Sequence, residues 1–180
     1  MFFFCGPDEA GASAAANKII SLLDDPGERI EMAGADLRKD PVLLGDEARS
    51  NSLFGGTRHI FVRASGDEAH DAVKNLIEGE GEACPVLIVA TSATEKSRTA
   101  KLLDKRDDAL VAMFWPPDLQ AVSSSVRAMA EGAGLQLNGD IAERIARAAG
   151  LDVRLAQSEV EKLALYLDAS PQSPRTVDLD

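Results

Sequence analysis

The sequence predicts an α/β fold: a five-stranded parallel sheet covered by helices, followed by a small three-helix domain. Between residues 2 and 115, short apolar runs alternate with helical patterns, which is typical of the βα units that build a parallel sheet. The sequence Pro116-Pro117 ends this alternation, and the patterns after it are helical. The chain has 180 residues, which is long enough for one domain with a substantial hydrophobic core and a second, smaller domain.

Five apolar runs are predicted to form the strands. The first is an aromatic run that ends at Gly6, and the fourth, V-L-I-V-A from Val86, is the most apolar. Continuous apolar runs are expected because the strands of a parallel sheet are buried on both faces. The predicted strands are residues 2–5, 29–33, 59–64, 85–91 and 109–115.

The predicted helices begin and end at recognisable signals. The first carries an apolar face and stops at Asp24-Asp25-Pro26-Gly27. Asp40 followed by Pro41 is the pattern of an N-cap and a first-turn proline, so a helix is expected from Asp40 to about Ser50. The predicted helices are residues 13–23, 40–50, 67–78, 95–106, 119–133, 140–149 and 152–167.

The chain is expected to divide near residue 117. Residues 1–117 are predicted to form the α/β domain, and residues 118–168 a three-helix lid domain. Residues 169–180 are rich in Ser and Pro and are predicted to be a linker.

Composition excludes several classes of protein. The net charge of -11 and the pI of about 4.6 argue against autonomous binding of nucleic acid, which needs a basic face. No apolar run approaches the ~18–20 residues of a membrane span, and the aromatic start lacks the basic flank of a signal peptide. Cys5 and Cys84 have no metal-ligand spacing, and free thiols in the cytoplasm are expected. No metal site and no cofactor are predicted.

One motif has the spacing of a phosphate-binding loop without its lysine. The working pattern is G-x-x-x-x-G-K-[ST] between a strand and a helix. Gly6, Gly11 and Ser13 keep this frame, but Ala12 stands where the lysine would reach the phosphates. The two acidic residues between the glycines would repel a triphosphate, because both are negatively charged. We therefore predict a degenerate loop that does not bind ATP.

The metal ligands of such an ATPase are missing as well. They would follow the third strand, but that strand ends F-V-R-A-S, and the first acid after it is Asp67. Positioning and electrostatics supply nearly all of the catalysis in phosphoryl transfer, so no catalytic residue is predicted. The alternative is a divergent nucleotide-binding protein or NTPase that uses Ser13 with a nonstandard lysine, Lys18 or Lys96.

A second motif places two large apolar residues in a connection. Ser52-Leu53-Phe54-Gly55-Gly56 lies between a predicted helix and a predicted strand. In one interpretation, Leu53 and Phe54 pack into the core of this chain. In the other, they project together and fill a hydrophobic pocket on a partner, as binding hot spots do, while Gly55 and Gly56 let the backbone turn sharply.

A third stretch, residues 95–106, is locally basic in an acidic chain. It is either a solvated helix face or a contact to an acidic partner or to a DNA backbone. His59 and His70 share no ligand spacing, so structural or solvent-facing roles are expected for both.

The order and spacing of four segments resemble one family over nearly the whole chain: the amino-terminal part of the delta subunit of the bacterial DNA polymerase III clamp loader. The S-L-F-G-G-x-R pattern before an apolar strand and the E-V-E-K-L-A-L-Y helix are its specific marks. The matching segments are residues 2–9, 51–58, 86–89 and 158–166.

The resemblance implies an AAA+-like fold without ATPase activity. Such subunits bind the sliding clamp (beta) and hold one of its interfaces open during DNA replication. They do so with a leucine–phenylalanine pair that corresponds to Leu53 and Phe54, flanked here by Ser52 and Gly55. The implied partners are gamma or tau and delta prime subunits in the polymerase holoenzyme, with DNA reached through the complex and no membrane involved.

The chain departs from the family at its end. Family members have a helical collar domain that assembles the loader, and these residues stop at Asp180, where it would begin. Residues 169–180 are then a linker toward a collar domain that is missing here, and loader assembly depends on that domain. A third interpretation is a scaffold that binds loader subunits without binding the clamp.

Overall fold

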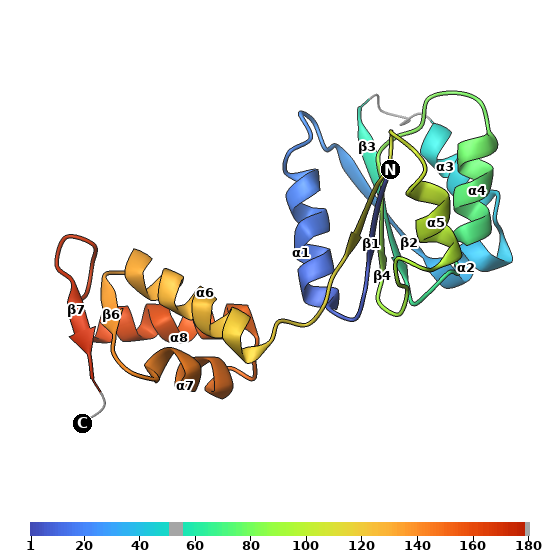
Figure 1. Cartoon of the computed structure of the whole chain (residues 1–180). Helices are drawn as coiled ribbons and strands as arrows, with labels where there is room; N and C mark the ends of the chain where they lie inside the picture. The colour runs from blue at the N-terminus through green and yellow to red at the C-terminus, as the bar shows by residue number, and fades with distance from the viewer. Residues whose placement is uncertain (51–55, 179–180) are drawn as a thin grey trace. The chain divides into compact units, whose positions relative to one another are not determined.

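The computed structural model describes residues 1–50 and 56–178, and the chain forms two compact units (Figure 1). The first unit, Met1–Pro116, is an α/β domain, and the second, Pro117–Asp180, is mainly helical. Each unit has its own hydrophobic core.

The first unit is built on a five-stranded parallel sheet in the order β2-β3-β4-β1-β5. The predicted α/β fold is therefore confirmed. Strand β1 comes first in the chain but lies between β4 and β5, and its last residue, Cys5, pairs with Ala90 and with Met113. The strands are β1 Phe2–Cys5, β2 Glu28–Ala33, β3 Arg58–Ala64, β4 Val86–Ala90 and β5 Leu110–Met113.

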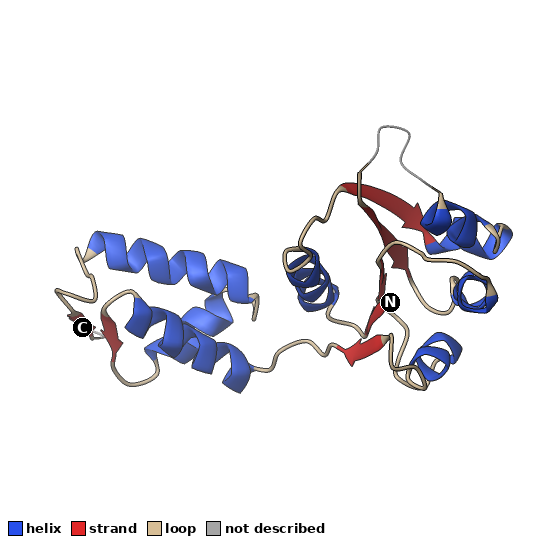
Figure 2. Cartoon of the chain, turned by 90° about the horizontal axis from the view of Figure 1, so that it is seen from above, coloured by secondary structure: helices blue, strands red, loops and turns tan. Residues whose placement is uncertain are grey.

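Helices cover both faces of the sheet, but unequally (Figure 2). Helix α1 alone packs on one face, where alternate strand residues such as Phe4, Phe61 and Leu87 are buried against it. The opposite alternate residues, such as Phe3 and Ile60, form the larger core on the other face. The helices of that face are α2 Gly34–Lys39, α3 Leu43–Arg49, α4 His70–Glu78 and α5 Arg98–Leu103.

The segment between β2 and β3 differs from the prediction. Helix α2 was not predicted, and Asp40, expected as the N-cap of a helix, is instead the C-cap of α2. Its carboxylate accepts a hydrogen bond from the backbone N–H of Val42 at 3.2 Å, which makes a short turn before α3 begins at Leu43. The Asp-Pro pair therefore separates two short helices.

The second unit contains the three predicted helices and two short strands that were not predicted. The helices pack around small apolar residues, among them Val126, Ala146 and Val160. The elements are α6 Leu119–Gly132, β6 Leu135–Leu137, α7 Ile141–Ala148, α8 Val153–Tyr166 and β7 Arg175–Val177.

The end of the chain folds back instead of forming the expected linker. Strands β6 and β7 pair in parallel, which ties residues 175–177 to the helical unit. Gly134 makes this possible, because it has a φ of +79° and an added Cβ would lie 2.1 Å from the carbonyl oxygen of Ser170.

Two further features concern the helices' apolar length and the cysteines. Among the described residues, no helix has both the length and the apolar character needed to cross a membrane. Cys5 ends β1 and Cys84 precedes β4, so they lie toward opposite ends of adjacent parallel strands, and both thiols are free.

Candidate functional site

The predicted phosphate-binding loop lies at the carboxyl edge of the sheet, where parallel α/β folds bind their ligands. Only three residues, Gly6 to Asp8, connect β1 to α1. Gly6 has a φ of +115°, and an added Cβ would lie 2.1 Å from the carbonyl oxygen of Phe114. Helix α1 spans Glu9–Ile20, so it begins four residues before the predicted start at Ser13.

The extra helical turn changes what the motif can do. The carboxylate of Asp8 caps α1 and accepts a hydrogen bond from the backbone N–H of Gly11 at 2.9 Å. An added Cβ on Gly11 would come within 2.2 Å of the other Asp8 oxygen, so this glycine makes room for the cap. Ala12 is buried, and Ala12 and Ser13 are helical. The second half of the predicted loop is therefore helix, with a carboxylate of this chain at its positive end.

The first acid after β3, Asp67, is used in a similar way. Its carboxylate accepts hydrogen bonds from the backbone N–H of Arg98 at 2.9 Å and from the backbone N–H and hydroxyl of Thr99 at 3.0 and 2.7 Å. Burial acts to raise the pKa of Asp67, but the hydrogen bonds from Thr99 and Arg98 outweigh it and hold the pKa below its ordinary value. Asp67 therefore ties the end of β3 to the first turn of α5.

An open hollow of about 300 Å³ remains at the carboxyl ends of β2, β3 and β4. Its charged lining residues are Glu9, Arg63 and Glu68. The place where an ATPase carries acids at the end of β3 holds Arg63, whose guanidinium lies 3.8 Å from Glu9 and 3.8 Å from Glu31. No lysine lines the hollow, and the described residues contain no group of three potential metal ligands.

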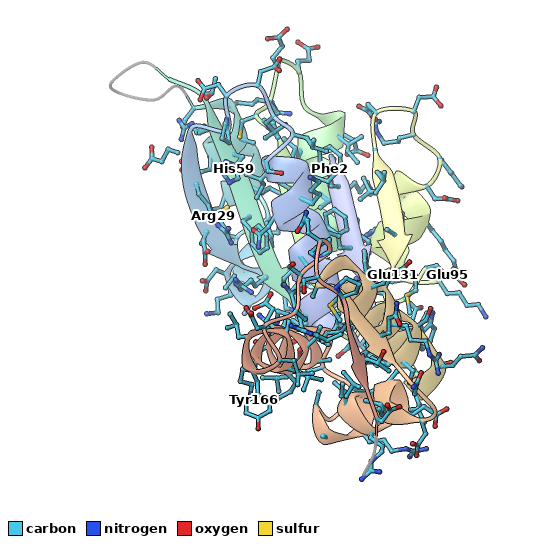
Figure 3. All side chains as sticks on the ribbon, turned by 90° about the vertical axis from the view of Figure 1, so that its left-hand side faces the viewer. Phe2, Arg29, His59, Glu95, Glu131 and Tyr166 are labelled. Carbon is cyan, nitrogen blue, oxygen red and sulfur yellow. The ribbon has the colours of Figure 1, made fainter. Side chains whose placement is uncertain are left out.

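Beside this hollow, arginines cover the sheet face that α1 leaves open. The guanidinium of Arg29 lies 4.0 Å from the centre of the Phe61 ring and that of Arg63 lies 5.1 Å from it. Figure 3 looks onto this face, with Arg29 and His59 on one side of α1 and Phe2 on the other. Each arginine also pairs with Glu31, and Arg63 pairs with Glu9 as well, so the two arginines are balanced by two glutamates.

The lysines of the alternative NTPase interpretation lie elsewhere. Lys18 is in the last turn of α1, about 15 Å along the helix from Asp8 at ~1.5 Å per residue. Lys96 is exposed in the connection between β4 and α5. Neither lines the hollow at the carboxyl edge.

The second candidate motif lies outside the described residues. This holds for Ser52, Leu53, Phe54 and Gly55, which were assigned to clamp binding. The structure does place the two ends of their connection: Ser50 follows α3, and Gly56 and Thr57 lead into β3.

The Thr57 end is fixed to the loop before β2. The Thr57 hydroxyl donates to the carbonyl oxygen of Asp25 at 2.9 Å, and the Thr57 carbonyl accepts from the backbone N–H of Glu28 at 3.0 Å. Gly27, with a φ of +57°, permits this approach, because an added Cβ would lie 1.8 Å from the Thr57 oxygen. His59 adds a contact of 2.7 Å between its Nδ1 and the carbonyl oxygen of Pro26, so this buried histidine has a structural role.

The Ser50 end is fixed by the arginine of the motif. One nitrogen of the Arg58 guanidinium pairs with the carboxylate of Glu47 at 2.7 Å, and another donates to the carbonyl oxygen of Ser50. The Arg58 side chain is only 10% exposed. The sequence pattern includes Thr57 and Arg58 but does not predict their anchoring role; the available signal was an arginine at a strand start, two residues after a pair of glycines.

The basic side chains of residues 95–106 differ in whether they form ion pairs. Lys96, Lys101 and Lys105 are exposed and have no ion pair within the described part of the chain. Arg98 lies 3.9 Å from Asp67, and Arg106 pairs with Asp108 at 2.7 Å. The exposure of the three lysines is what a solvated face would show.

Comparison with solved structures places this fold among known proteins. A Bacillus subtilis DNA clamp loader delta protein aligns with a TM-score of 0.60 and 13% identity, over 97% of this chain and 55% of that one. The Thermotoga maritima RuvB Holliday junction branch migration motor aligns with a TM-score of 0.51 and 15% identity, over 94% of this chain and 56% of that one. A point mutant of the same motor gives 0.52 and 13%, over 94% and 57%.

These likenesses show a common fold. No family model matches the sequence, and no curated protein matches it either. The chain spans a little over half the length of the structures that it resembles. At 13–15% identity the comparison identifies the architecture: a five-stranded parallel sheet of the AAA+ type with a helical second unit.

Proposed function

We propose that this chain acts as the delta subunit of a clamp loader, binding the sliding clamp and stabilising its opened form during DNA replication without hydrolysing ATP. The fold of the B. subtilis clamp loader delta protein supports this proposal. The S-L-F-G-G-x-R pattern supports it independently of the fold, and in the sequence it falls between the end of α3 and the start of β3.

The observation that carries the proposal is the anchored base of this connection. Arg58, whose side chain is 10% exposed, and Thr57, which is exposed, hold its two ends against α3 and the loop before β2. The contacts fix the two positions from which the connection begins and ends, and pre-organisation of this kind lowers the entropic cost of binding. Leu53 and Phe54 are the proposed anchors, with Ser52 and Gly55 beside them.

Burial of two apolar side chains supplies a binding free energy of the size that the proposed role needs. Burying both in a pocket on the clamp contributes roughly 3–6 kcal/mol, at about 1.5–3 kcal/mol each. A ligand shifts an equilibrium by its differential affinity for the two states, so this energy stabilises the open ring if the pocket is fully reached only there.

The proposed role needs no chemistry in this chain. Two acids at the carboxyl edge, Asp8 and Asp67, accept hydrogen bonds from the first turns of helices in their own domain. ATP binding would belong to gamma or tau subunits, with delta prime completing the loader through a collar domain, and DNA would be reached only in that assembly.

Titration calorimetry with the sliding clamp of the same organism tests the proposal. The wild-type chain is expected to bind with micromolar or tighter affinity, and Leu53→Ala with Phe54→Ala is expected to abolish binding while the fold persists. A matched control is Leu165→Ala with Tyr166→Ala, an adjacent leucine–aromatic pair that is 82% and 85% exposed on α8. Loss of binding in the control pair, or retention in the first pair, would contradict the assignment, and unfolding of the first variant would place its side chains in the core.

A further inference from the structure

Strand β5 (Leu110–Met113) forms one border of the sheet, and its outer edge is open. In the described part of the chain it pairs with β1 and with no other strand, and it leads into the connection to the second unit (Figure 1). None of its four residues is fully buried, and Leu110 is 44% exposed. Three of the four residues of β1, which has a strand on each side, are buried.

The backbone of β5 shows which groups this edge leaves without a partner. The N–H groups of Leu110 and Phe114 donate to carbonyl oxygens of residues 1–5 at 2.9 and 2.7 Å. Because the hydrogen-bonding groups of a strand alternate between its two sides, the N–H and C=O of Val111 and Met113 point away from β1. Outside the ladder with β1, no hydrogen bond to these groups is found among the described residues.

The two borders of the sheet differ in how they are protected. At the other border, β2 carries Glu28, Arg29 and Glu31, and charges on an edge strand oppose pairing with another chain. Strand β5 carries no charge, and the apolar sequence extends beyond it at both ends, as A-L-V-A-M-F-W over residues 109–115. An open, uncharged, apolar edge is the kind that accepts a further strand.

The sequence of this edge is self-complementary in one antiparallel register. The apolar run 109–115 has Ala112 at its centre and is bounded by Asp108 and Pro116. When two copies meet with Ala112 opposite Ala112, every residue of the run lies opposite a residue of the same run. Asp108 then lies opposite Pro116 of the other copy, so the like charges of the two copies are kept apart.

The same register also matches the hydrogen-bonding groups and the two faces of the sheet. Val111 lies opposite Met113 of the other copy, so the outward N–H and C=O groups of both residues face each other. Their side chains pack on the larger core, whereas those of Ala112 and Phe114 pack on the face that α1 covers. Each face of the sheet therefore continues into the same face of the other copy.

We propose that β5 is a self-association edge, at which two copies of this chain pair antiparallel with Ala112 on the two-fold axis. The occupant is a second copy because the edge itself is the strand that fits it: an apolar run whose neighbouring charge lies outside the paired residues. Trp115, which is 67% exposed, lies opposite Ala109 of the other copy in this register and becomes partly covered. The two-fold arrangement closes the contact, since each edge is used once.

The charge of the chain sets how this association depends on salt. Each copy has a net charge of -11, so two copies repel each other at long range. Salt screens this repulsion and leaves backbone hydrogen bonds and apolar contacts in place, so association should tighten between about 50 and about 500 mM NaCl. Contacts made by ion pairs would weaken over the same range.

Sedimentation equilibrium of the full chain tests the proposal. The mass of the wild-type chain is expected to rise with concentration from 19.1 kDa to twice that value, and the emission of Trp115, its one tryptophan, should shift to shorter wavelength in parallel. Leu110→Lys should weaken association at least about tenfold, because the ammonium would lie against Phe114 of the other copy. The control Leu22→Lys, at a leucine of the same unit that is 65% exposed, should leave association unchanged.

A disulfide trap tests the register. In a non-hydrogen-bonded antiparallel pair the two Cα atoms lie about 4.5 Å apart, which is within reach of a disulfide. With oxidised glutathione, Ala112→Cys is therefore expected to give a covalent dimer on non-reducing gels. Ala109→Cys is the matched control, because the two copies of residue 109 would lie six positions apart along the strands, about 20 Å, and should not cross-link.

Each outcome decides the proposal without the sliding clamp. A wild-type chain that stays at 19.1 kDa up to about 1 mM, where even weak complexes form, overturns it, and so does wild-type association by Leu110→Lys. If Leu110→Lys does not fold, the cysteine pair decides: cross-linking of Ala112→Cys alone supports the proposal, and equal cross-linking of both variants or of neither overturns it. Clamp binding by the same chain is measured separately, so failure of the proposed function leaves this result unaffected.

Discussion

Replacing Asp67 with asparagine tests whether the first acid after β3 is a structural cap. Both Asp67 oxygens accept hydrogen bonds, one from Arg98 and the other from Thr99. Asparagine retains a single acceptor oxygen, so its amide nitrogen must face a backbone N–H on one side. The variant therefore loses a charge-assisted hydrogen bond and sets a donor against a donor.

The expected magnitude follows from those bonds. Hydrogen bonds to charged groups contribute about 1.5–3 kcal/mol, but the Asp67 side chain is 26% exposed, so the lower part of that range applies. We expect Asp67→Asn to lower the free energy of unfolding by about 1–2 kcal/mol and the melting temperature by about 2–8 °C. Asp107→Asn, an exposed aspartate of the same unit, is the control and should change neither.

The pH dependence of the stability difference is the more specific test. The pKa of Asp67 is lowered in the folded state, so its contribution is present above the ordinary pKa of aspartate and is lost as the pH falls through the folded value. Urea unfolding followed by circular dichroism should show a constant difference between wild type and Asp67→Asn at pH 5–8, shrinking under acid conditions below about pH 4. Equal stabilities at pH 7, or a difference that persists in strong acid, would refute the reasoning.

Three further predictions concern other features of the molecule. Gly6→Ala should destabilise the first unit more than Gly139→Ala destabilises the second, in urea titrations, because both glycines have positive φ but only Gly6 approaches a backbone carbonyl; the strain term alone is about 1–3 kcal/mol, and equal costs would contradict the clash. Mg²⁺-ATP should leave the melting temperature unchanged, because the Asp8 cap stands where a phosphate would bind; a concentration-dependent rise would support the NTPase alternative. Gly134→Ala should weaken the pairing of β6 with β7 and speed amide exchange at Arg175, whose N–H donates to the carbonyl oxygen of Gly134; unchanged exchange would show that this approach is not needed.

The sheet could be predicted because its strands are continuous apolar runs with clear ends. Each of the five predicted strands contains a strand of the structure or matches it to within about one residue. The long helices of the second unit were likewise predictable, since each begins near an aspartate N-cap, such as Asp118 or Asp152, and carries an apolar face.

Short elements were not predictable because local sequence carries little of their stability. Helix α2 starts with Gly34 and has six residues, which is below the length at which propensity is informative. Strands β6 and β7 have three residues each, and only a partner distant in sequence selects them. The start of α1 was not predicted because the phosphate-loop spacing implies a loop as far as Ala12, whereas the Asp8 carboxylate caps a helix that begins at Glu9.

In the candidate site, too, the sequence predicts some features and not others. The motif residues from Ser52 to Gly55 follow from sequence resemblance and lie outside the described residues. The anchoring contacts of Thr57 and Arg58 depend on which elements meet at the base of the connection, and sequence alone does not contain that information.

The most direct test of the central claim is a fluorescence measurement of clamp opening. Donor and acceptor dyes placed across one interface of the sliding clamp report its separation as the chain is added. We expect the wild-type chain to lower energy transfer in proportion to the complex formed, and Leu53→Ala with Phe54→Ala to leave the transfer unchanged. If the wild-type chain binds the clamp without lowering the transfer, or does not bind it at all, the chain does not open the clamp as proposed.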